Sequence, residues 1–436
     1  MKSAKAAKAL AATLTTTTGP PRILETVSLG FNLISLFSLS FFCILLIFLC
    51  CLYKQYRDRR IHVYYNRTSR NKAIVGSIKP LLNEYNPTLW LPGSFMKIMF
   101  NGFSNSKKKQ EVGDDFYRRM NVELEDGEVI ALDVHPQRDH FDSGKPYSEK
   151  ARTIIFVPGI FGHSLSIGCS QLSSLAWERL KWRTVIFNRR GYSNMPIKSD
   201  RITSFDIVSD LKQVVDYVRR EYDDAPVYLV GISVGAAQIQ KYLQTYGEHS
   251  GVSGAVCTAV PWDVKETGRK ISSSSMVEKA MVFRAKKFVK KLVMNENLKK
   301  VLKAKKISFD KILSCKTKRE VDEELYVKDT GAGSVEEYYE GLSTHTEMEK
   351  VKCPLLCVNS LDDPVSAYHM APLEKIGSEG YEHWIQVNTG GGGHVEFFSG
   401  FCPERWIYRL VLQYLKSVDS VLHQNKSTGR GGMSEA

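Results

Sequence analysis

The chain has 436 residues, of which 43% are hydrophobic and 25% are charged, and these proportions are normal for a chain that buries a core. Its nine cysteines are odd in number and mostly lie in apolar runs, which excludes a disulfide framework or a zinc site and indicates buried free thiols. The net charge of +13 is concentrated in the first 70 residues and between Lys265 and Lys306, without a nucleic-acid-binding motif. Anionic lipid headgroups are therefore the expected partner, and nucleic acid is not.

The N-terminal part divides into a low-complexity tail and an apolar run. We expect residues 1–26 to be disordered, because they are rich in lysine, alanine and threonine and end near a Gly-Pro-Pro break. Residues 27–53 carry no charged side chain. A bilayer core needs about 20 apolar residues in a helix, so this run predicts a transmembrane helix. A cleaved signal peptide, with a shorter apolar region of roughly 7 to 15 residues, and a buried core helix are the alternatives.

Basic residues follow the predicted span, and we interpret residues 54–81 as a basic juxtamembrane linker. The positive-inside rule then places the C-terminal side in the cytosol of a single-pass protein of the endomembrane system. The lumenal side is the alternative. Two glycosylation sequons, Asn66-Arg-Thr68 and Asn425-Lys-Ser427, lie after the span and can be modified only if that side is lumenal.

Strand-like and helix-like segments alternate through residues 82–422. Strands are expected within 122–134, as two strands joined by a turn, and at 153–157, 184–188, 228–230, 255–260, 355–358 and 384–387, and helices at 206–222 and 406–421. This alternation predicts an α/β fold with a mostly parallel central sheet and helices on both faces. Residues 423–436 are polar and glycine-rich, and we expect them to be disordered.

The alternation breaks between residues 262 and 352, where we expect an inserted helical cap. One helix of this cap has an apolar face made by Val277, Met281, Ala285, Phe288, Val289 and Leu292. Lysines lie on the opposite face, at positions 279, 286, 287, 290 and 291. That basic face is either a solvated surface or a contact for lipid headgroups.

A nucleophile motif occurs at Gly231-Ile-Ser-Val-Gly235, between a predicted strand and a predicted helix. In a nucleophile elbow the serine occupies a strained strand-to-helix turn, and the flanking glycines avoid clashes with neighbouring backbone. The pattern alone is weak, but its strand and helix context strengthens it. We therefore expect Ser233 to be a catalytic nucleophile, with a turn serine as the structural alternative.

A serine nucleophile needs a histidine base and a carboxylate that orients the imidazole. His394 follows four glycines after the last predicted strand, and Asp362 and Asp363 follow the preceding strand. The chain order Ser233, Asp363, His394 is that of an α/β-hydrolase triad, with Asp362 as the alternative acid. The expected oxyanion hole consists of Val234 N–H and the N–H of Ile160 or Phe161.

With these motifs the chain resembles the membrane-anchored branch of the α/β-hydrolase-domain (ABHD) family, which has acylglycerol lipase and medium-chain phospholipase members. The resemblance covers roughly Leu82 to Leu415. It rests on Asn86–Trp90, Asp126–Asp133, Pro158–Gly162, Asn188–Ser193, Gly231–Gly235, Tyr338-Tyr339 with Ser343, Asp362–Pro364 and Gly392–His394. Ala236 departs from the family pattern, because a third glycine is common there. The resemblance implies this triad, an ester-lipid substrate and a catalytic domain on the lumenal side of the membrane.

The sequence thus predicts a membrane-anchored serine hydrolase that cleaves carboxylic esters of lipids, either acylglycerols or phospholipids, through an acyl-enzyme. We expect neither a cofactor nor a metal. The alternatives are a non-catalytic or receptor-like lipid-binding protein on the same fold, and a serine thioesterase or peptidase.

Overall fold

The computed structural model of the chain describes residues 38–53, 56, 59–108, 116–137, 151–202, 208–293 and 296–429. These residues belong to two units, Met1–Lys54 and Gln55–Ala436, each of which is described by itself. The predicted N-terminal tail lies outside the described residues, as do residues 27–37 of the predicted span and 430–436 of the predicted C-terminal tail.

In the first unit, residues 38–53 form a helix whose large apolar side chains are mostly exposed, among them Phe41, Phe42 and Ile47. None of the helices in the described ranges combines the length and the apolar character that crossing a membrane requires.

The second unit is built on one large sheet. Its strands are β1 (Ile61–Tyr65), β2 (Arg118–Glu123), β3 (Val129–His135), β4 (Thr153–Val157), β5 (Arg183–Phe187), β6 (Val227–Ile232), β7 (Gly254–Thr258), β8 (Leu355–Ser360) and β9 (Trp384–Thr389). Within the described residues their spatial order is β1-β9-β8-β7-β6-β4-β5-β3-β2. The six central strands, β9, β8, β7, β6, β4 and β5, run parallel to one another. β1 pairs antiparallel with β9 at one edge, and at the other edge β3 pairs antiparallel with β5 and with β2. The expected mostly parallel sheet is confirmed.

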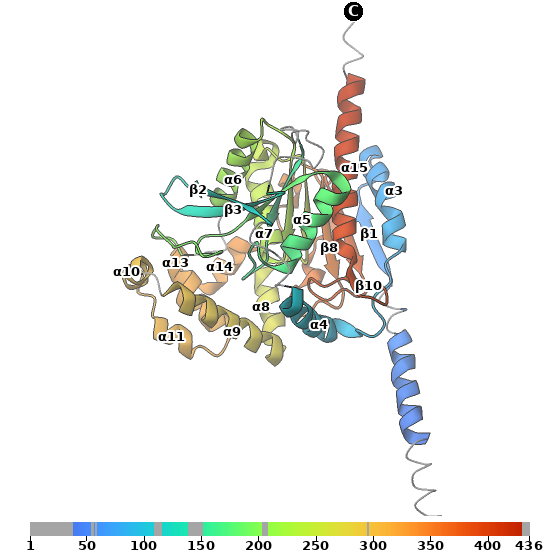
Figure 1. The fold of residues 1–436 in the computed structure, drawn as a ribbon, viewed down its shortest axis with the longest axis horizontal. Coiled ribbons are helices and arrows are strands. Elements are labelled where there is room, and N and C mark those ends of the chain that lie inside the picture. The colour runs from blue at the N-terminus through green and yellow to red at the C-terminus, as the bar shows by residue number, and fades with distance from the viewer. Residues whose placement is uncertain are drawn as a thin grey trace, which may run out of the picture. The chain divides into compact units, whose positions relative to one another are not determined.

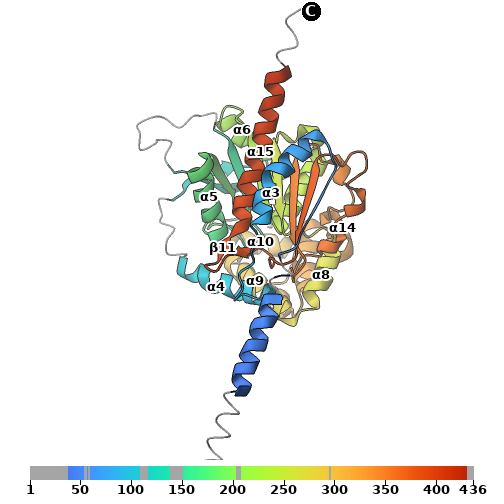
Figure 2. The same cartoon turned by 90° about the vertical axis from the view of Figure 1, so that its right-hand side faces the viewer.

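Helices cover both faces of this sheet (Figures 1 and 2). On one face lie α3 (Ser69–Asn83), α5 (Ile167–Leu180) and α15 (Trp406–Gly429), and on the other lie α6 (Val208–Glu221) and α7 (Val234–Tyr246). Successive side chains of a strand point to opposite faces. Ile154 and Phe156 of β4 accordingly pack with α5 and α15, while Ile155 and Val157 pack with α6 and α7.

The segment that the sequence indicated as a basic linker, 54–81, belongs to the folded domain from β1 onward. β1 pairs antiparallel with β9 along its whole length. Ile74, Ile78 and Leu82 of α3 are buried in the same core cluster as α15. Their four-residue spacing is that of a helical face, which the abundance of basic residues obscured. At the other end α15 continues to Gly429, so the tail expected to be disordered from residue 423 begins as helix.

The cap lies between β7 and β8, where the sequence indicated an insertion at 262–352. It comprises α8 (Val264–Ser272), α9 (Ser275–Leu292), α10 (Glu296–Ala304), α11 (Phe309–Ser314), α12 (Lys318–Val321), a π-helical turn η2 (Asp322–Val327), α13 (Lys328–Thr330) and α14 (Val335–Leu342). On the expected apolar face of α9, Ala285 and Val289 are buried, and the opposite lysines 279 and 290 are exposed. The cap has its own apolar core, which contains Val289, Leu298 and Tyr339.

Three smaller sets of elements complete the domain. Helix α4 (Gly93–Lys108) lies at the same end of the domain as α8 and α9 (Figures 1 and 2). Strands β10 (Phe398–Ser399) and β11 (Glu404–Arg405) form a small antiparallel ribbon before α15. Short 3₁₀ turns occur at η1 (Gly247–Ser250), η3 (Met348–Lys350), η4 (Tyr368–Met370) and η5 (Leu373–Lys375).

Candidate active site

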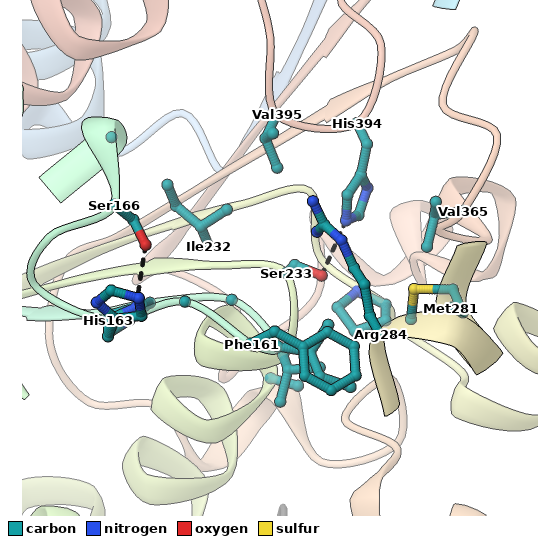
Figure 3. A pocket seen from close by; sticks show the side chains of 18 of the residues that line it. Phe161, His163, Ser166, Ile232, Ser233, Met281, Arg284, Val365, His394 and Val395 are labelled. Carbon is teal, nitrogen blue, oxygen red and sulfur yellow. Dashed lines mark hydrogen bonds between the residues drawn. The ribbon is translucent and has the colours of Figure 1, made fainter. Parts of the chain in front are cut away.

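Three side chains from widely separated parts of the sequence meet at the carboxyl ends of the parallel strands. Ser233 follows β6, Asp363 follows β8 and His394 follows β9, and these ends lie at one edge of the sheet. His394 Nε2 is 2.9 Å from Ser233 Oγ, as the dashed line in Figure 3 marks, and His394 Nδ1 is 2.8 Å from Asp363 Oδ2. The Asp363 side chain is fully buried, and that of His394 is 15% exposed. The structure therefore brings the predicted serine, base and acid into one hydrogen-bonded line.

Ser233 occupies a strained turn between β6 and α7. Its φ of 57° and ψ of −120° are unusual for a residue with a side chain. A Cβ on Gly235 would lie 2.1 Å from Val157 O, and one on Gly231 would lie 2.6 Å from Gly235 O. The two glycines are required because backbone fills the space that a side chain would need. This geometry presents the Ser233 hydroxyl above the sheet edge, as the elbow motif indicated.

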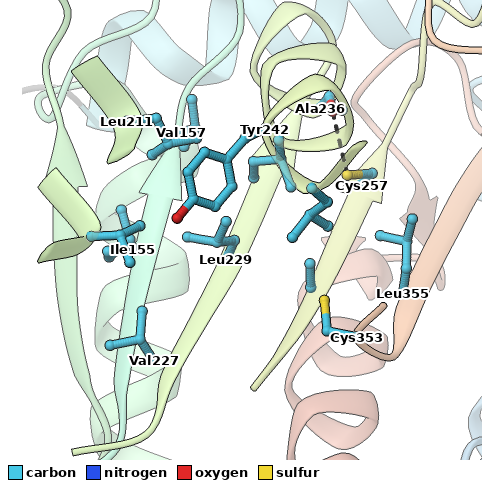
Figure 4. Close-up of a cluster of buried hydrophobic side chains, with 14 of the residues drawn as sticks. Ile155, Val157, Leu211, Val227, Leu229, Ala236, Tyr242, Cys257, Cys353 and Leu355 are labelled. Atoms are coloured by element: carbon cyan, nitrogen blue, oxygen red, sulfur yellow. Dashed lines mark hydrogen bonds between the residues drawn. The ribbon is translucent and has the colours of Figure 1, made fainter. Parts of the chain in front are cut away.

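The turn rests on a closely packed core beneath α7 (Figure 4). Tyr242 and Ala236 of α7 belong to the same buried cluster as Val157 and Leu229 of the sheet. Cys257 Sγ donates to Ala236 O at 3.4 Å. Cys257 is a free thiol, as are the buried Cys169, Cys315, Cys353 and Cys357. The core thus fixes the start of α7 and with it the position of Ser233.

Asp362, the alternative acid, does not contact the imidazole but holds the loop that carries it. Its Oδ1 accepts from the N–H groups of Gly392 and Gly393, at 2.8 Å and 2.7 Å. Its Oδ2 lies 3.0 Å from Nζ of Lys97, whose side chain is only 1% exposed. Burial raises the pKa of Asp362, but Lys97 and the hydrogen bonds outweigh it, so that this pKa lies below its ordinary value. Asp363 therefore occupies the position of the acid, and Asp362 anchors the histidine loop.

Glu396, which the sequence reasoning missed, supports the same loop from the other side. Its Oε2 accepts from the N–H groups of His394 and Val395 at 2.9 Å and 3.0 Å, and its Oε1 accepts from Asn101 Nδ2 at 3.1 Å. The side chain is 2% exposed, and burial raises its pKa. Asn101 and Lys97 both belong to α4. This helix therefore ties down the histidine loop through two polar contacts.

The environment of His394 sets its proton affinity. Burial lowers the pKa of His394, but the negative charge of Asp363 and its hydrogen bond to the imidazole outweigh this effect. The pKa of His394 therefore lies above its ordinary value. A base with a raised pKa binds the serine proton more strongly, and it becomes neutral and active only at higher pH.

The residues predicted to form the oxyanion hole line the cavity that contains Ser233. Val234 is the first residue of α7, so its N–H has no acceptor within the helix. Ile160 and Phe161 line the same cavity as Ser233, and Phe161 has a left-handed φ of 59°. A Cβ on Gly159 would lie 3.4 Å from Ser233 Cβ, which shows how closely this loop approaches the serine. Ile160, Phe161 and Val234 thus all line the cavity that contains Ser233, and their role as oxyanion donors stays a prediction.

Arg189 holds the oxyanion loop in place, a role that its sequence position did not reveal. It is 1% exposed and donates to Gly159 O at 3.0 Å, to Pro158 O, and to Gln238 Oε1 of α7 at 3.1 Å. Its guanidinium group thereby links the loop to the helix that follows the serine. Its place directly after a buried strand indicates only that the charge needs an internal partner, without saying which one.

A cavity of about 1180 Å³ opens onto Ser233 and His394 (Figure 3). It lies between the sheet edge, α4 and the cap, and Ile98, Phe161, Met281 and Phe288 are among its apolar lining residues. Its volume exceeds the roughly 300 to 1,000 Å³ usual for small-ligand pockets. Within the described residues no group of histidine, cysteine and acidic side chains has the arrangement of a metal site.

A family model described as "Serine aminopeptidase, S33" (Hydrolase_4) matches residues 148–380, which is more than half of the chain. The chain belongs to this family of α/β-hydrolases. Within the family it falls in the ABHD branch. It is 26% identical over 355 residues to "Phospholipase ABHD3" from Bos taurus, a match that covers 80% of this chain and 82% of that protein.

Two further ABHD proteins match over most of their length. "Protein abhd-3.2" from Caenorhabditis elegans is 25% identical over 339 residues, which cover 77% of this chain and 85% of that protein. "Monoacylglycerol lipase ABHD2" from Mus musculus is 22% identical over 372 residues, which cover 82% of this chain and 85% of that protein. The family match and these relatives together identify this ABHD-type protein as an enzyme of the lipase and esterase type.

Proposed function

We propose that the protein hydrolyses carboxylic ester bonds of lipids, with Ser233 as nucleophile, His394 as general base and acid, and Asp363 as the group that orients His394. One observation carries the proposal. The hydrogen-bonded line of these three side chains opens into a largely apolar cavity of about 1180 Å³, large enough for an acyl chain. Relatives named as a phospholipase and a monoacylglycerol lipase support a lipid ester as the substrate.

In the proposed reaction Ser233 Oγ attacks the ester carbonyl carbon while His394 Nε2 accepts the hydroxyl proton. The negative charge that develops on the carbonyl oxygen is stabilised by Val234 N–H and by the N–H of Ile160 or Phe161. When the tetrahedral intermediate collapses, the C–O bond to the alcohol breaks and His394 returns the proton to that oxygen. Water then attacks the acyl-enzyme by the same route, which releases the carboxylic acid and restores Ser233.

The alternative functions fit the site less well. A receptor-like lipid-binding protein does not need a strained serine bonded to a buried His-Asp pair, because backbone strain costs about 1 to 3 kcal/mol. The family model is described as an aminopeptidase, and a peptide bond can be cleaved by the same three residues. The apolar lining by Phe161, Met281 and Phe288 favours a lipid acyl chain over a peptide.

The first test compares the hydrolysis of carboxylic esters with that of amides and thioesters by the purified full chain. We expect a fluorophosphonate probe to label the protein, and we expect hydrolysis of lipid esters without cleavage of an aminoacyl amide. Monoacylglycerol and lysophosphatidylcholine with one shared acyl chain, an aminoacyl-naphthylamide and an acyl-coenzyme A thioester form the panel. Hydrolysis of the amide or the thioester alone would instead assign a peptidase or a thioesterase.

We also propose that the enzyme is membrane-anchored through residues 27–53, which carry no charged side chain. An apolar surface on the catalytic domain supports a position close to a bilayer. Helix α4, whose Ile98 lines the cavity, has four exposed apolar side chains, Phe95, Met96, Met99 and Phe103. The full chain is expected to stay in the membrane pellet after alkaline carbonate extraction, and a variant that lacks residues 1–53 is expected to need no detergent. Release of the intact chain into the carbonate supernatant would contradict the anchor.

For the orientation we propose that the catalytic domain faces the cytosol, because basic residues between Lys54 and Lys72 follow the span. Asn425, one of the two glycosylation reporters, lies in the helix α15, and Asn66 lies in the turn between β1 and α3. Because a cytosolic domain is not reached by the glycosylation enzymes of the lumen, we expect endoglycosidase treatment to cause no shift in the size of the protein. A shift that Asn66→Gln or Asn425→Gln removes would place the domain in the lumen.

A further inference from the structure

The helix α9 presents a row of cations to the cavity. Arg284, Lys287 and Lys291 all line it, and their spacing of three and four residues places them on one side of the helix. In Figure 3 the Arg284 side chain extends from α9 toward the His394 side of the pocket. All three cations line the cavity that contains Ser233 and His394, and the same helix supplies the apolar lining residues Met281 and Phe288.

Few protein groups neutralise the positive charge of these three side chains. Across the described residues, no carboxylate forms an ion pair with Arg284 or Lys287, while Lys291 Nζ donates to Asn194 Oδ1 at 2.8 Å. The acidic side chains that line the cavity have other partners. Asp322 pairs with Lys318 and accepts from Tyr339 OH, and Glu396 accepts from backbone N–H groups.

Arg284, Lys287 and Lys291 are exposed and also line the cavity, so their charges are accessible to an anionic ligand. A substrate with an anionic group next to its acyl chain would supply both the counter-charge and the apolar filling. A phosphate matches a guanidinium group well, since the planar fork of donors can bind two phosphate oxygens. A neutral acylglycerol has no group for this row.

We propose that Arg284, together with Lys287 and Lys291, binds the phosphate of a phospholipid substrate whose ester carbonyl lies at Ser233. This inference rests on the proposed lipid ester hydrolysis. The acyl chain lies among the apolar side chains of the cavity, and the phosphate lies against α9. The enzyme therefore selects phosphate-bearing esters over neutral acylglycerols of the same chain length.

The test uses Arg284→Gln and Lys287→Gln in the full chain. Lys279→Gln and Lys290→Gln are matched controls, because both lysines are exposed on α9 and neither lines the cavity. The substrates are lysophosphatidylcholine, a monoacylglycerol with the same acyl chain, and a short p-nitrophenyl ester. We expect Arg284→Gln to lower kcat/KM for the lysophospholipid by about tenfold or more, the scale of a lost hydrogen bond to a charged group.

The same variant is expected to change kcat/KM for the two neutral esters by less than about twofold, with unchanged fluorophosphonate labelling and thermal unfolding. The two controls are expected to leave all three substrates unaffected. Equal loss for all three substrates in Arg284→Gln, or loss for none, would overturn the proposal.

Two further outcomes separate this inference from the proposed function and from free phosphate. Hydrolysis by the wild type of the monoacylglycerol but not of the lysophospholipid would overturn the phosphate site and leave lipid ester hydrolysis standing. No hydrolysis of any ester would contradict both. Inhibition by inorganic phosphate that Arg284→Gln abolishes, without any preference for the lysophospholipid, would assign the row to free phosphate and overturn the headgroup site.

Discussion

Replacing Ser233 with alanine is expected to lower lipid ester turnover by about 10⁴- to 10⁶-fold and to abolish fluorophosphonate labelling. The physical reason is that, among the described residues, Ser233 Oγ is the hydroxyl that hydrogen-bonds to His394 Nε2, at 2.9 Å, and can take the acyl group. Alanine keeps the Cβ, so the strained turn and its packing persist. The measurement is kcat/KM with the lysophospholipid and the monoacylglycerol described above.

The controls separate lost chemistry from lost structure. Thermal unfolding of Ser233→Ala is expected to match that of the wild type within a few degrees, and His394→Ala is expected to lose as much turnover as Ser233→Ala. Ser420→Ala changes a serine on α15 far along the chain, whose hydroxyl donates to Lys416 O, and is expected to be fully active. Turnover of Ser233→Ala near the wild-type value would refute the assignment of the nucleophile.

Asp363→Asn is expected to lower turnover by about 10⁴-fold while leaving the fold stable. Its Oδ2 accepts from His394 Nδ1 at 2.8 Å, and an amide in this place can turn its NH₂ group toward the ring and favour the wrong tautomer. The neighbouring variant Asp362→Asn acts by another route. It leaves the buried Lys97 cation without its partner, so its main effect is expected on stability, by about 3 to 5 kcal/mol.

The pH profile distinguishes the two aspartates. Protonated His394 cannot accept the serine proton, so kcat/KM rises with pH as His394 loses its proton. Since the pKa of His394 is raised, we expect the acid limb of the wild type above about 6.5. In Asp363→Asn the negative charge is gone, so the limb is expected at lower pH. Asp362→Asn is expected to keep the wild-type limb, and the opposite pattern would exchange the two roles.

The sequence was most informative where local geometry restricts the residue types. Only glycine fits at positions 231 and 235, because a Cβ there would meet backbone atoms at 2.6 Å and 2.1 Å, and this makes the elbow visible as a motif. The parallel strands were predictable because their apolar runs are buried on both faces and alternate with helical patterns. The order of serine, acid and histidine follows from the order of β6, β8 and β9 along the chain.

The sequence could not decide between features that depend on tertiary contacts. Asp362 and Asp363 are adjacent in one loop, and only their partners, Lys97 from α4 and His394 from the loop after β9, distinguish them. Arg189 and Glu396 were missed because their partners are mostly backbone groups, which no pattern of side chains reveals. β1 was read as part of a linker because an edge strand of five residues pairs with β9, over 300 residues away in sequence.

The central claim is that Ser233 is the nucleophile of this α/β-hydrolase, and peptide mapping after fluorophosphonate labelling tests it most directly. The wild-type full chain is labelled, digested and analysed by tandem mass spectrometry for the modified residue. The account predicts one phosphonylated site, on Ser233, and slower labelling while the lipid ester substrate is present in excess. A label on another serine, or an unmodified Ser233 peptide in a fully inactivated enzyme, would contradict it.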